Sequence, residues 1–90
     1  MMALTLRQLE YLLAVAEHRS FTRAASALYV SQPALSQQLS QLEHTLQVKL
    51  IDRTSREIRL TPAGRVYVEH AARALGELHW ASRALDEFDD

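Results

Sequence analysis

The sequence predicts one mainly α-helical domain that carries a small β-hairpin and ends in a long helix. Apolar residues recur at spacings of three and four along most of the chain, which is the period of an amphipathic helix. Residues 57–60 instead alternate between polar and apolar, as a strand does. The 90 residues are 48% hydrophobic and 23% charged, with two Gly and two Pro, which fits a single globular core.

Two helices are predicted in the first third of the chain. Thr5 is a suitable N-cap, and Thr5 and Gln8 have the spacing of a capping box, so the first helix begins there. Its apolar face continues to about residue 18. Ser20 can cap a second helix of two turns, which ends where residues 29–31 interrupt the apolar pattern.

A third helix is predicted after Ser31, its N-cap. Pro33 is tolerated in the first turn because the N–H groups there have no acceptor within the helix. The core-facing ridge of this helix consists of Leu35, Leu39, Leu42 and Leu46. The opposite face has short or amide side chains with almost no charge: Gln32, Pro33, Ser36, Gln37, Ser40, Gln41 and His44.

The last part of the chain predicts a hairpin and then the long helix. Residues 50–51 can pair with residues 57–60. Thr61 and Pro62 then restart a helix, which continues to about residue 88 despite Gly76. Seven residues of this helix are spaced alternately four and three apart, as at the a and d positions of a two-stranded coiled coil. We call them the dimer seam: Tyr67, Ala71, Ala74, Leu78, Ala81, Leu85 and Phe88.

Charge is segregated along the chain although the net charge is only −1. Residues 19–65 hold seven cations against three anions, and residues 66–90 hold two cations against six anions. The middle of the chain therefore predicts a positive surface and the end a negative one. The simpler interpretation is that both are ordinary solvated faces.

The second and third helices, joined by a three-residue break, have the layout of a helix-turn-helix. Gln and Ser both donate and accept hydrogen bonds, which suits base edges in the major groove, and Pro or Ala can contact a thymine methyl group. The candidate base-reading residues are Gln32, Pro33, Ala34, Ser36 and Gln37. The alternative is a solvated face, although such faces are usually rich in Glu and Lys.

Cations and hydroxyl groups suited to DNA phosphates surround the third helix. The N-terminus of the second helix favours an anion, and the hairpin carries three arginines. The candidate backbone-contacting residues are Ser20, Thr22, Arg23, Ser31, Ser40, Arg53 and Arg56. Alternatively, Arg53 or Arg59 can lie over the core or pair with Asp52 or Glu57.

Catalytic and membrane functions find little support. The four histidines lack the spacing of metal ligands, the chain has no Cys, and Gly64 and Gly76 stand alone rather than in a phosphate-binding loop. Without a long apolar run or a signal peptide, we expect a cytoplasmic protein that is not an enzyme and binds neither metal nor membrane. The rival interpretation is a helical protein-interaction module whose acidic tail docks a partner.

Several motifs resemble those of the LysR-type bacterial transcription regulators. The matching stretches are residues 21–28 (FTRAASAL), 31–39 (SQPALSQQL), 41–43 (QLE), 52–53 (DR) and 60–64 (LTPAG). Residues 14–18 and 20–28 also resemble the branch of that family that regulates cyanate operons. The family often has Arg where this chain has Gln37, and it usually has Gly where this chain has Gln47.

The resemblance implies a winged helix-turn-helix over residues 4–61, with the helix-turn-helix at 21–40, and a linker and dimerisation helix over 62–90. It implies a recognition helix at 32–46 in the major groove, with the hairpin as wing. By motif position, the family's base-reading residues correspond to Gln32, Ala34, Ser36 and Gln37. Its backbone-contacting residues correspond to Thr22, Arg23, Arg53 and Arg56. The implied partners are double-stranded operator DNA and a second copy, with a tetramer for the full-length protein. No cofactor is implied here, and a small-molecule effector is implied for a separate C-terminal domain.

Overall fold

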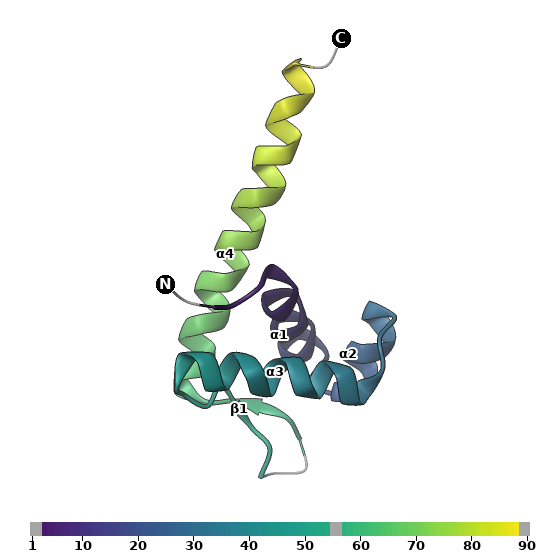
Figure 1. Cartoon of the computed structure of the whole chain (residues 1–90), viewed down its shortest axis with the longest axis vertical. Helices are drawn as coiled ribbons and strands as arrows, with labels where there is room; N and C mark the ends of the chain where they lie inside the picture. Colours follow the sequence, from purple (N-terminus) through teal and green to yellow (C-terminus); the bar gives the residue numbers. More distant parts are fainter. Residues whose placement is uncertain (1–2, 55–56, 89–90) are drawn as a thin grey trace.

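The structure, a computed structural model, describes residues 3–54 and 57–88. Three helices come first: α1 (Leu6–His18), α2 (Phe21–Leu28) and α3 (Gln32–Leu46). A hairpin of β1 (Ile51–Asp52) and β2 (Arg59–Leu60) follows, and the chain ends in α4 (Pro62–Ala84) and the short 3-10 helix η1 (Leu85–Phe88). Figure 1 shows α1, α2 and α3 packed together, with α4 extending away from them. The predicted mainly α-helical domain with one hairpin is confirmed.

All four predicted N-caps are confirmed. The side chains of Thr5, Ser20, Ser31 and Thr61 each accept a hydrogen bond from the backbone N–H three residues later, and Thr5 and Gln8 complete the capping box. These bonds satisfy N–H groups that a helix start leaves without an intrahelical partner. The local start signals therefore set where the helices begin.

Each of the first three helices ends on a non-glycine residue in the left-handed conformation. Arg19, Tyr29 and Gln47 have φ values of 53°, 59° and 56°. This conformation usually favours Gly, because a Cβ crowds the backbone there. At Gln47 the side chain makes a local bond, in which Nε2 donates to the His44 carbonyl at 2.6 Å. The turn after α3 thus accepts the Gln47 side chain in the left-handed conformation.

The core lies between α1, α2, α3 and the hairpin. Its largest fully buried side chains are Leu12, Val15, Leu35, Leu39, Leu42 and Leu50. Three of the four predicted ridge leucines of α3 are among them, and Leu46 packs against the cluster while partly buried. Burying side chains of this size contributes about 1.5–3 kcal/mol each. The packing holds α3 with its Ser and Gln face outward.

The hairpin pairs one residue later than predicted. β1 and β2 are antiparallel, with Ile51 opposite Leu60 and Asp52 opposite Arg59, whereas the sequence pattern paired residues 50–51 with 57–60. Leu50 lies outside the ladder, and its backbone carbonyl instead bonds to the residue that caps α4. Its carbonyl accepts the Thr61 N–H at 3.0 Å, and the Thr61 hydroxyl donates to the Lys49 carbonyl at 2.7 Å.

The long helix begins at Pro62 as predicted but ends earlier, and part of the predicted dimer seam is buried. It ends at Ala84, and Leu85 and Phe88 belong to the 3-10 helix that follows rather than to a continuous α-helix. Tyr67 and Ala71, expected in the dimer seam, lie inside the domain: Tyr67 packs against the core, and Ala71 is only 4% exposed. The first two positions of the seam are therefore already covered by the chain itself.

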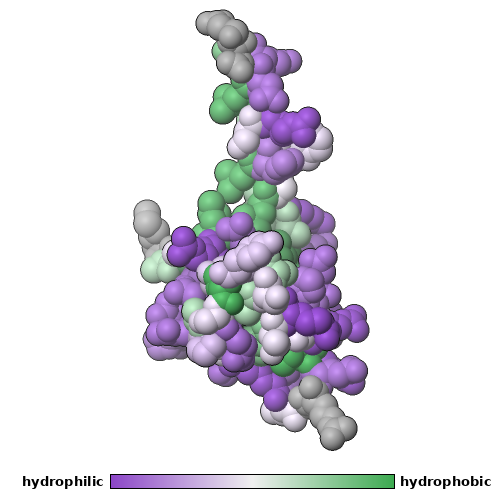
Figure 2. All heavy atoms as spheres, turned by 90° about the vertical axis from the view of Figure 1, so that its right-hand side faces the viewer, coloured by the Kyte–Doolittle hydropathy of each residue, from purple (hydrophilic) through white to green (hydrophobic). Residues whose placement is uncertain are grey.

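The rest of α4 stands clear of the domain. The molecule measures 52 × 29 × 19 Å, and Figure 2 shows hydrophobic side chains gathered along one side of the protruding helix. Leu78, Leu85 and Phe88 are 48%, 64% and 79% exposed. No helix of the described residues is long and apolar enough to cross a membrane.

Candidate nucleic-acid interface

The outer face of α3 is open to solvent where the sequence predicts base reading. Gln32, Pro33, Ala34 and Gln37 are exposed, and Ser36 is half-buried. Ser31 caps the helix by accepting the Ala34 N–H at 3.2 Å, so the first turn is ordered without help from a ligand. The face therefore presents a fixed array of amide, hydroxyl and methyl groups on a rigid helix.

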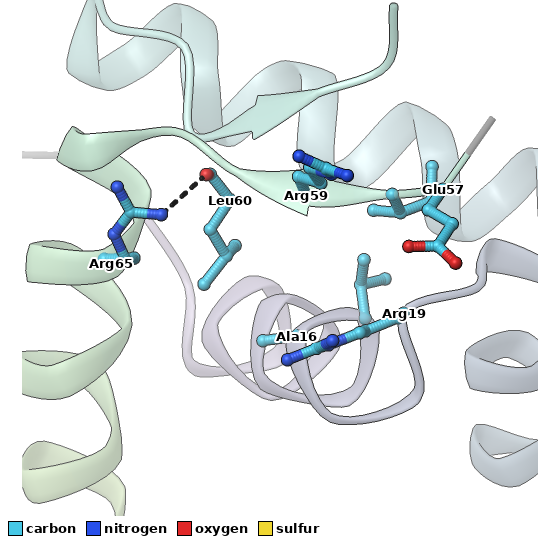
Figure 3. Close-up of a pocket in the computed structure, with 8 residues that line it drawn as sticks. Ala16, Arg19, Glu57, Arg59, Leu60 and Arg65 are labelled. Carbon is cyan, nitrogen blue, oxygen red and sulfur yellow. Dashed lines mark hydrogen bonds between the residues drawn. The ribbon is translucent and has the colours of Figure 1, made fainter. Parts of the chain in front are cut away.

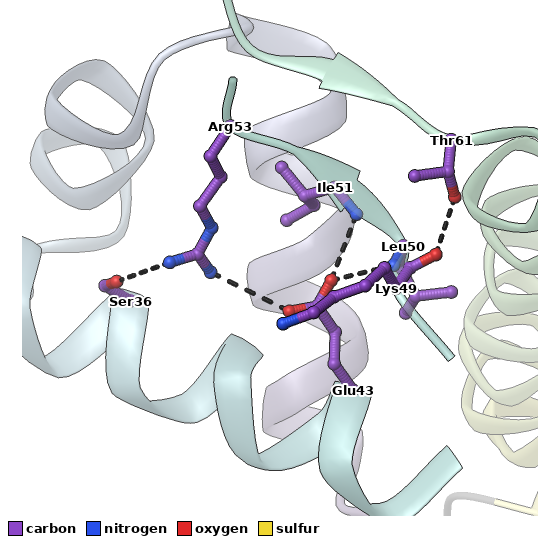
Figure 4. Close-up of polar contacts among 7 residues, drawn as sticks. All are labelled: Ser36, Glu43, Lys49, Leu50, Ile51, Arg53 and Thr61. Atoms are coloured by element: carbon purple, nitrogen blue, oxygen red, sulfur yellow. Dashed lines mark hydrogen bonds and ion pairs between the residues drawn. The ribbon is translucent and has the colours of Figure 1, made fainter. Parts of the chain in front are cut away.

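Arg53 connects the wing to this face. Its Nη1 donates to Ser36 Oγ at 3.3 Å, and its Nη2 lies 4.0 Å from Glu43 Oε1 (Figure 4). Its guanidinium carbon also lies 4.8 Å from the centre of the Phe21 ring, at the start of α2. One side chain thus joins the wing, the recognition helix and the second helix. The sequence-based alternative that Arg53 lies over the core holds in part, because Phe21 packs against the core, whereas the carboxylate that faces Arg53 is Glu43 rather than Asp52.

Glu43 is the functional residue that sequence reasoning missed. Its side chain is only 6% exposed, and Oε2 accepts the N–H groups of Leu50 at 2.7 Å and Ile51 at 3.1 Å. A carboxylate that accepts two backbone N–H groups holds β1 against α3 and so sets where the wing stands (Figure 4). The signal available in the sequence was a carboxylate directly after Leu42, inside the leucine ridge.

A groove between α3 and the wing contains a further predicted phosphate contact. It has a volume of about 360 Å³ and is lined by Ser40, Glu43, Lys49, Ile51, Asp52, Arg53, Thr54 and Thr61. Ser40 is exposed and lies one turn after Ser36, so hydroxyl and cationic groups share this groove. Arg56 falls outside the described residues.

The wing turn is ordered by Asp52. Its Oδ1 accepts the Thr54 hydroxyl at 2.6 Å and the Thr54 N–H at 2.9 Å. The hydroxyl bond, then the N–H bond and the nearby Arg59, lower the pKa of Asp52 below its ordinary value of 3.8, against a smaller opposing effect of burial. Asp52 is therefore committed to the turn and leaves Arg53 to other partners.

The start of α2 provides the other predicted phosphate contacts. Ser20 caps α2 by accepting the Arg23 N–H at 3.1 Å, and Thr22 and Arg23 are exposed. The Nη2 of Arg23 donates to the His18 carbonyl at 2.6 Å, which fixes the guanidinium at the junction of α1 and α2. The N-terminal amides of α2 add a partial positive charge beside it.

A second cationic cleft lies on the other side of the wing strand. It has a volume of about 310 Å³ and is lined by residues of α1, the wing and the start of α4: Val15, Ala16, Arg19, Glu57, Ile58, Arg59, Leu60 and Arg65. In Figure 3, Arg59 lies on the wing strand above Arg19, and Arg65 Nη1 donates to the Leu60 carbonyl at 3.5 Å. Lys49 and Arg53 therefore line the groove beside α3, whereas Arg19, Arg59 and Arg65 line this second cleft.

Comparisons with known proteins agree with this geometry. A family model described as "Bacterial regulatory helix-turn-helix protein, lysR family" matches residues 6–65. The hydrogen peroxide-inducible genes activator of Pectobacterium carotovorum subsp. carotovorum is 51% identical over 75 residues, which cover 83% of this chain and 25% of that protein. The transcriptional regulator CfxR of Cupriavidus necator is 43% identical over 88 residues, covering 98% of this chain and 28% of that protein. The chain thus spans about a quarter of the length of these relatives.

Solved structures give the same result for the fold. The BenM DNA-binding domain, in its complex with the catB site 1 DNA, superposes with a TM-score of 0.92 and 35% identity, covering 94% of this chain and 96% of that one. Vibrio fischeri DarR in complex with DNA superposes with a TM-score of 0.90 and 30% identity, covering 97% of this chain and 30% of that one. Resemblance to the cyanate branch stays a prediction, because none of these relatives is described as a cyanate regulator.

Proposed function

The chain belongs to the LysR family of bacterial regulatory helix-turn-helix proteins, and on that premise we propose that it binds double-stranded operator DNA. The observation that carries the proposal is the exposed Ser and Gln face of α3 beside a wing that Arg53 and Glu43 hold in place. α3 enters the major groove, because that groove admits one α-helix. The similarity to the BenM domain, whose structure contains DNA, supports this docking.

The two sets of predicted contacts have different roles in this complex. Base edges are read by Gln32, Pro33, Ala34, Ser36 and Gln37. The phosphate backbone is contacted by Ser20, Thr22, Arg23, Ser31, Ser40, Arg53 and Arg56. Side chains of the first set determine sequence preference, whereas those of the second fix the register of the protein on the duplex and make binding salt-dependent.

We propose that two copies bind together through α4. The exposed hydrophobic side chains of α4 and of η1 after it give the reason, since Leu78, Leu85 and Phe88 have no core to join within one chain. Two paired domains place two copies of α3 on half-sites about one helical turn apart, so the operator is an interrupted palindrome. The whole protein assembles further, as a tetramer.

Membership of the family also suggests where the protein acts and which small molecules it binds. Its relatives are activators and transcriptional regulators, so we propose a regulatory rather than a catalytic function in the bacterial cytoplasm, where the DNA lies. The DNA-binding domain needs no cofactor of its own. A small-molecule effector acts on a separate domain, for which the greater length of the relatives leaves room.

The test is a selection of random duplexes by the 90-residue chain at about physiological salt, where nonspecific binding is weak. We expect enrichment of an interrupted palindrome. Gln37→Ala then relaxes the preference at one base pair in each half-site, whereas Arg23→Ala weakens all duplexes and lowers the salt slope by about one. Recovery of no motif, even with the α4 helices covalently paired, would favour a protein-interaction module instead.

A matched control removes a cation outside the proposed interface. Arg73 is exposed on α4, where it pairs with Glu69 at 2.8 Å. Arg73→Ala changes net charge by the same amount as Arg23→Ala, and we expect it to leave both the selected motif and the salt slope unchanged. An equal loss of slope in both variants would mean that overall charge, rather than the contact at α2, drives binding.

A further inference from the structure

Arg53 is held on three sides by other parts of the domain. Phe21 lies under the guanidinium, Ser36 accepts from it and Glu43 faces it, each from a different part of the domain. The side chain of Arg53 is only 38% exposed. A long cation on a flexible stem would otherwise sample many positions over the DNA backbone. Here its place beside the recognition helix is fixed before DNA arrives.

The contact with Arg53 restricts what Ser36 can do. A serine hydroxyl has one hydrogen to donate and two lone pairs that accept. Arg53 Nη1 occupies a lone pair of Ser36 Oγ, so the hydroxyl hydrogen stays free to donate (Figure 4). The positive guanidinium at 3.3 Å also repels any further donor that approaches the hydroxyl. Ser36 is thereby biased towards partners that accept.

We propose that Arg53 is a specificity-determining residue as well as a phosphate contact, because it sets Ser36 as a hydrogen-bond donor to the base edge. The inference rests on the proposed function and deepens it. In the major groove guanine offers the acceptors N7 and O6, adenine offers N7 and thymine offers O4, whereas cytosine offers only the N4 amino donor. The base opposite Ser36 is accordingly guanine, adenine or thymine, and cytosine is rejected.

The experiment compares the duplexes selected by the wild-type chain, Ser36→Ala, Arg53→Ala and the double variant. We expect Ser36→Ala to lower the preference at one base pair in each half-site by about five-fold, the worth of one hydrogen bond. Arg53→Ala lowers the preference at the same base pair and, in addition, the salt slope. The double variant loses no more preference at that position than Ser36→Ala alone, because the two residues act as one unit.

Arg23→Ala is the matched control, since it removes a phosphate contact that does not touch α3. It lowers the affinity for every duplex and leaves the preference at the Ser36 base pair intact. Thermal unfolding of each variant, followed by circular dichroism, verifies that α3 is still formed. The proposal is overturned if Arg53→Ala resembles Arg23→Ala, or if the base opposite Ser36 is cytosine. A wild-type chain that selects no motif would instead overturn the proposed function.

Discussion

At the scale of single residues, Glu43 positions the wing through hydrogen bonds to its backbone. Its buried carboxylate accepts the N–H groups of Leu50, just before β1, and of Ile51, the first residue of β1. The side chain is only 6% exposed, and an unpaired charge there would be costly. The two amides and the nearby Arg53 offset this cost. The wing therefore stands where it does because of one side chain on the recognition helix.

Removing this carboxylate should destabilise the fold. Glu43→Ala leaves the Leu50 and Ile51 N–H groups buried without an acceptor, so we expect a loss of about 2–4 kcal/mol in the free energy of unfolding. Glu43→Gln keeps an amide oxygen as acceptor, and its loss should be smaller. Urea denaturation measures both. Glu17→Ala, at an exposed position of α1, is the control and should change stability by less than about 0.5 kcal/mol. Equal effects at both positions would contradict the role of Glu43.

Asp52 gives a prediction about pH. Its bonds from Thr54 favour the ionised carboxylate, so the pKa of Asp52 is lower in the folded chain than in the unfolded one. The resulting stabilisation is fully present above the unfolded pKa and is lost as pH falls through the folded pKa. A nuclear magnetic resonance titration of the Asp52 carboxyl should show a pKa below 3.8, which rises towards 3.8 in Thr54→Val. An unchanged pKa in Thr54→Val would show that the hydroxyl is not the cause.

At the scale of elements, the two glycines of α4 have opposite roles. A Cβ on Gly64 would lie 2.0 Å from the Leu50 carbonyl oxygen, which is closer than atoms can approach, whereas a Cβ on Gly76 meets nothing within 4 Å. Gly64 is therefore required where the start of α4 packs on the backbone before β1. Gly76 lies in the helix interior and only raises the conformational entropy of the unfolded chain.

Alanine substitution should separate these two roles. We expect Gly64→Ala to destabilise the domain by more than about 2 kcal/mol, because backbone must move to admit the methyl group. Gly76→Ala should stabilise it by about 0.5–1 kcal/mol, since alanine is the better helix former. Midpoints of thermal unfolding of the two variants measure the difference. A tolerated Gly64→Ala would mean that α4 can shift away from β1 without loss.

Local sequence patterns predicted the helices and strands well but predicted the contacts between them poorly. The four N-caps and the leucine ridge of α3 were read correctly because each depends on residues three or four positions apart. The close approach of Gly64 to Leu50, the Glu43 bonds to β1 and the Arg53 contacts depend on how elements pack, and no local pattern encodes them. The same reason explains the shortened dimer seam, since spacing alone does not show that Ala71 is buried by its own chain.

At the scale of the whole molecule, the domain and the protruding helix have different partners. Net charge changes sign along the sequence, from positive over residues 19–65 to negative over residues 66–90. The acidic residues Asp86 and Glu87 lie in η1, after α4, and we expect the phosphates that attract the domain to repel this end of the chain. The exposed apolar side chains beyond the domain would then stay free to meet a second copy. Because Ala71 is buried and Tyr67 packs partly buried against the core, we expect pairing to begin at Ala74.

Self-association through α4 gives the last prediction. Replacing both Leu78 and Leu85 by Asp places like charges in the remaining seam, so we expect weaker dimerisation and, with it, weaker cooperative binding to a palindromic duplex. Sedimentation and DNA-binding curves measure the two effects. The control variant carries Ala72→Asp and His79→Asp, at exposed positions of α4 outside the seam, and adds the same negative charge. If the two double variants sediment alike, net charge or another surface governs assembly; if only the seam variant becomes monomeric and loses cooperativity, α4 sets the spacing of the two reading helices.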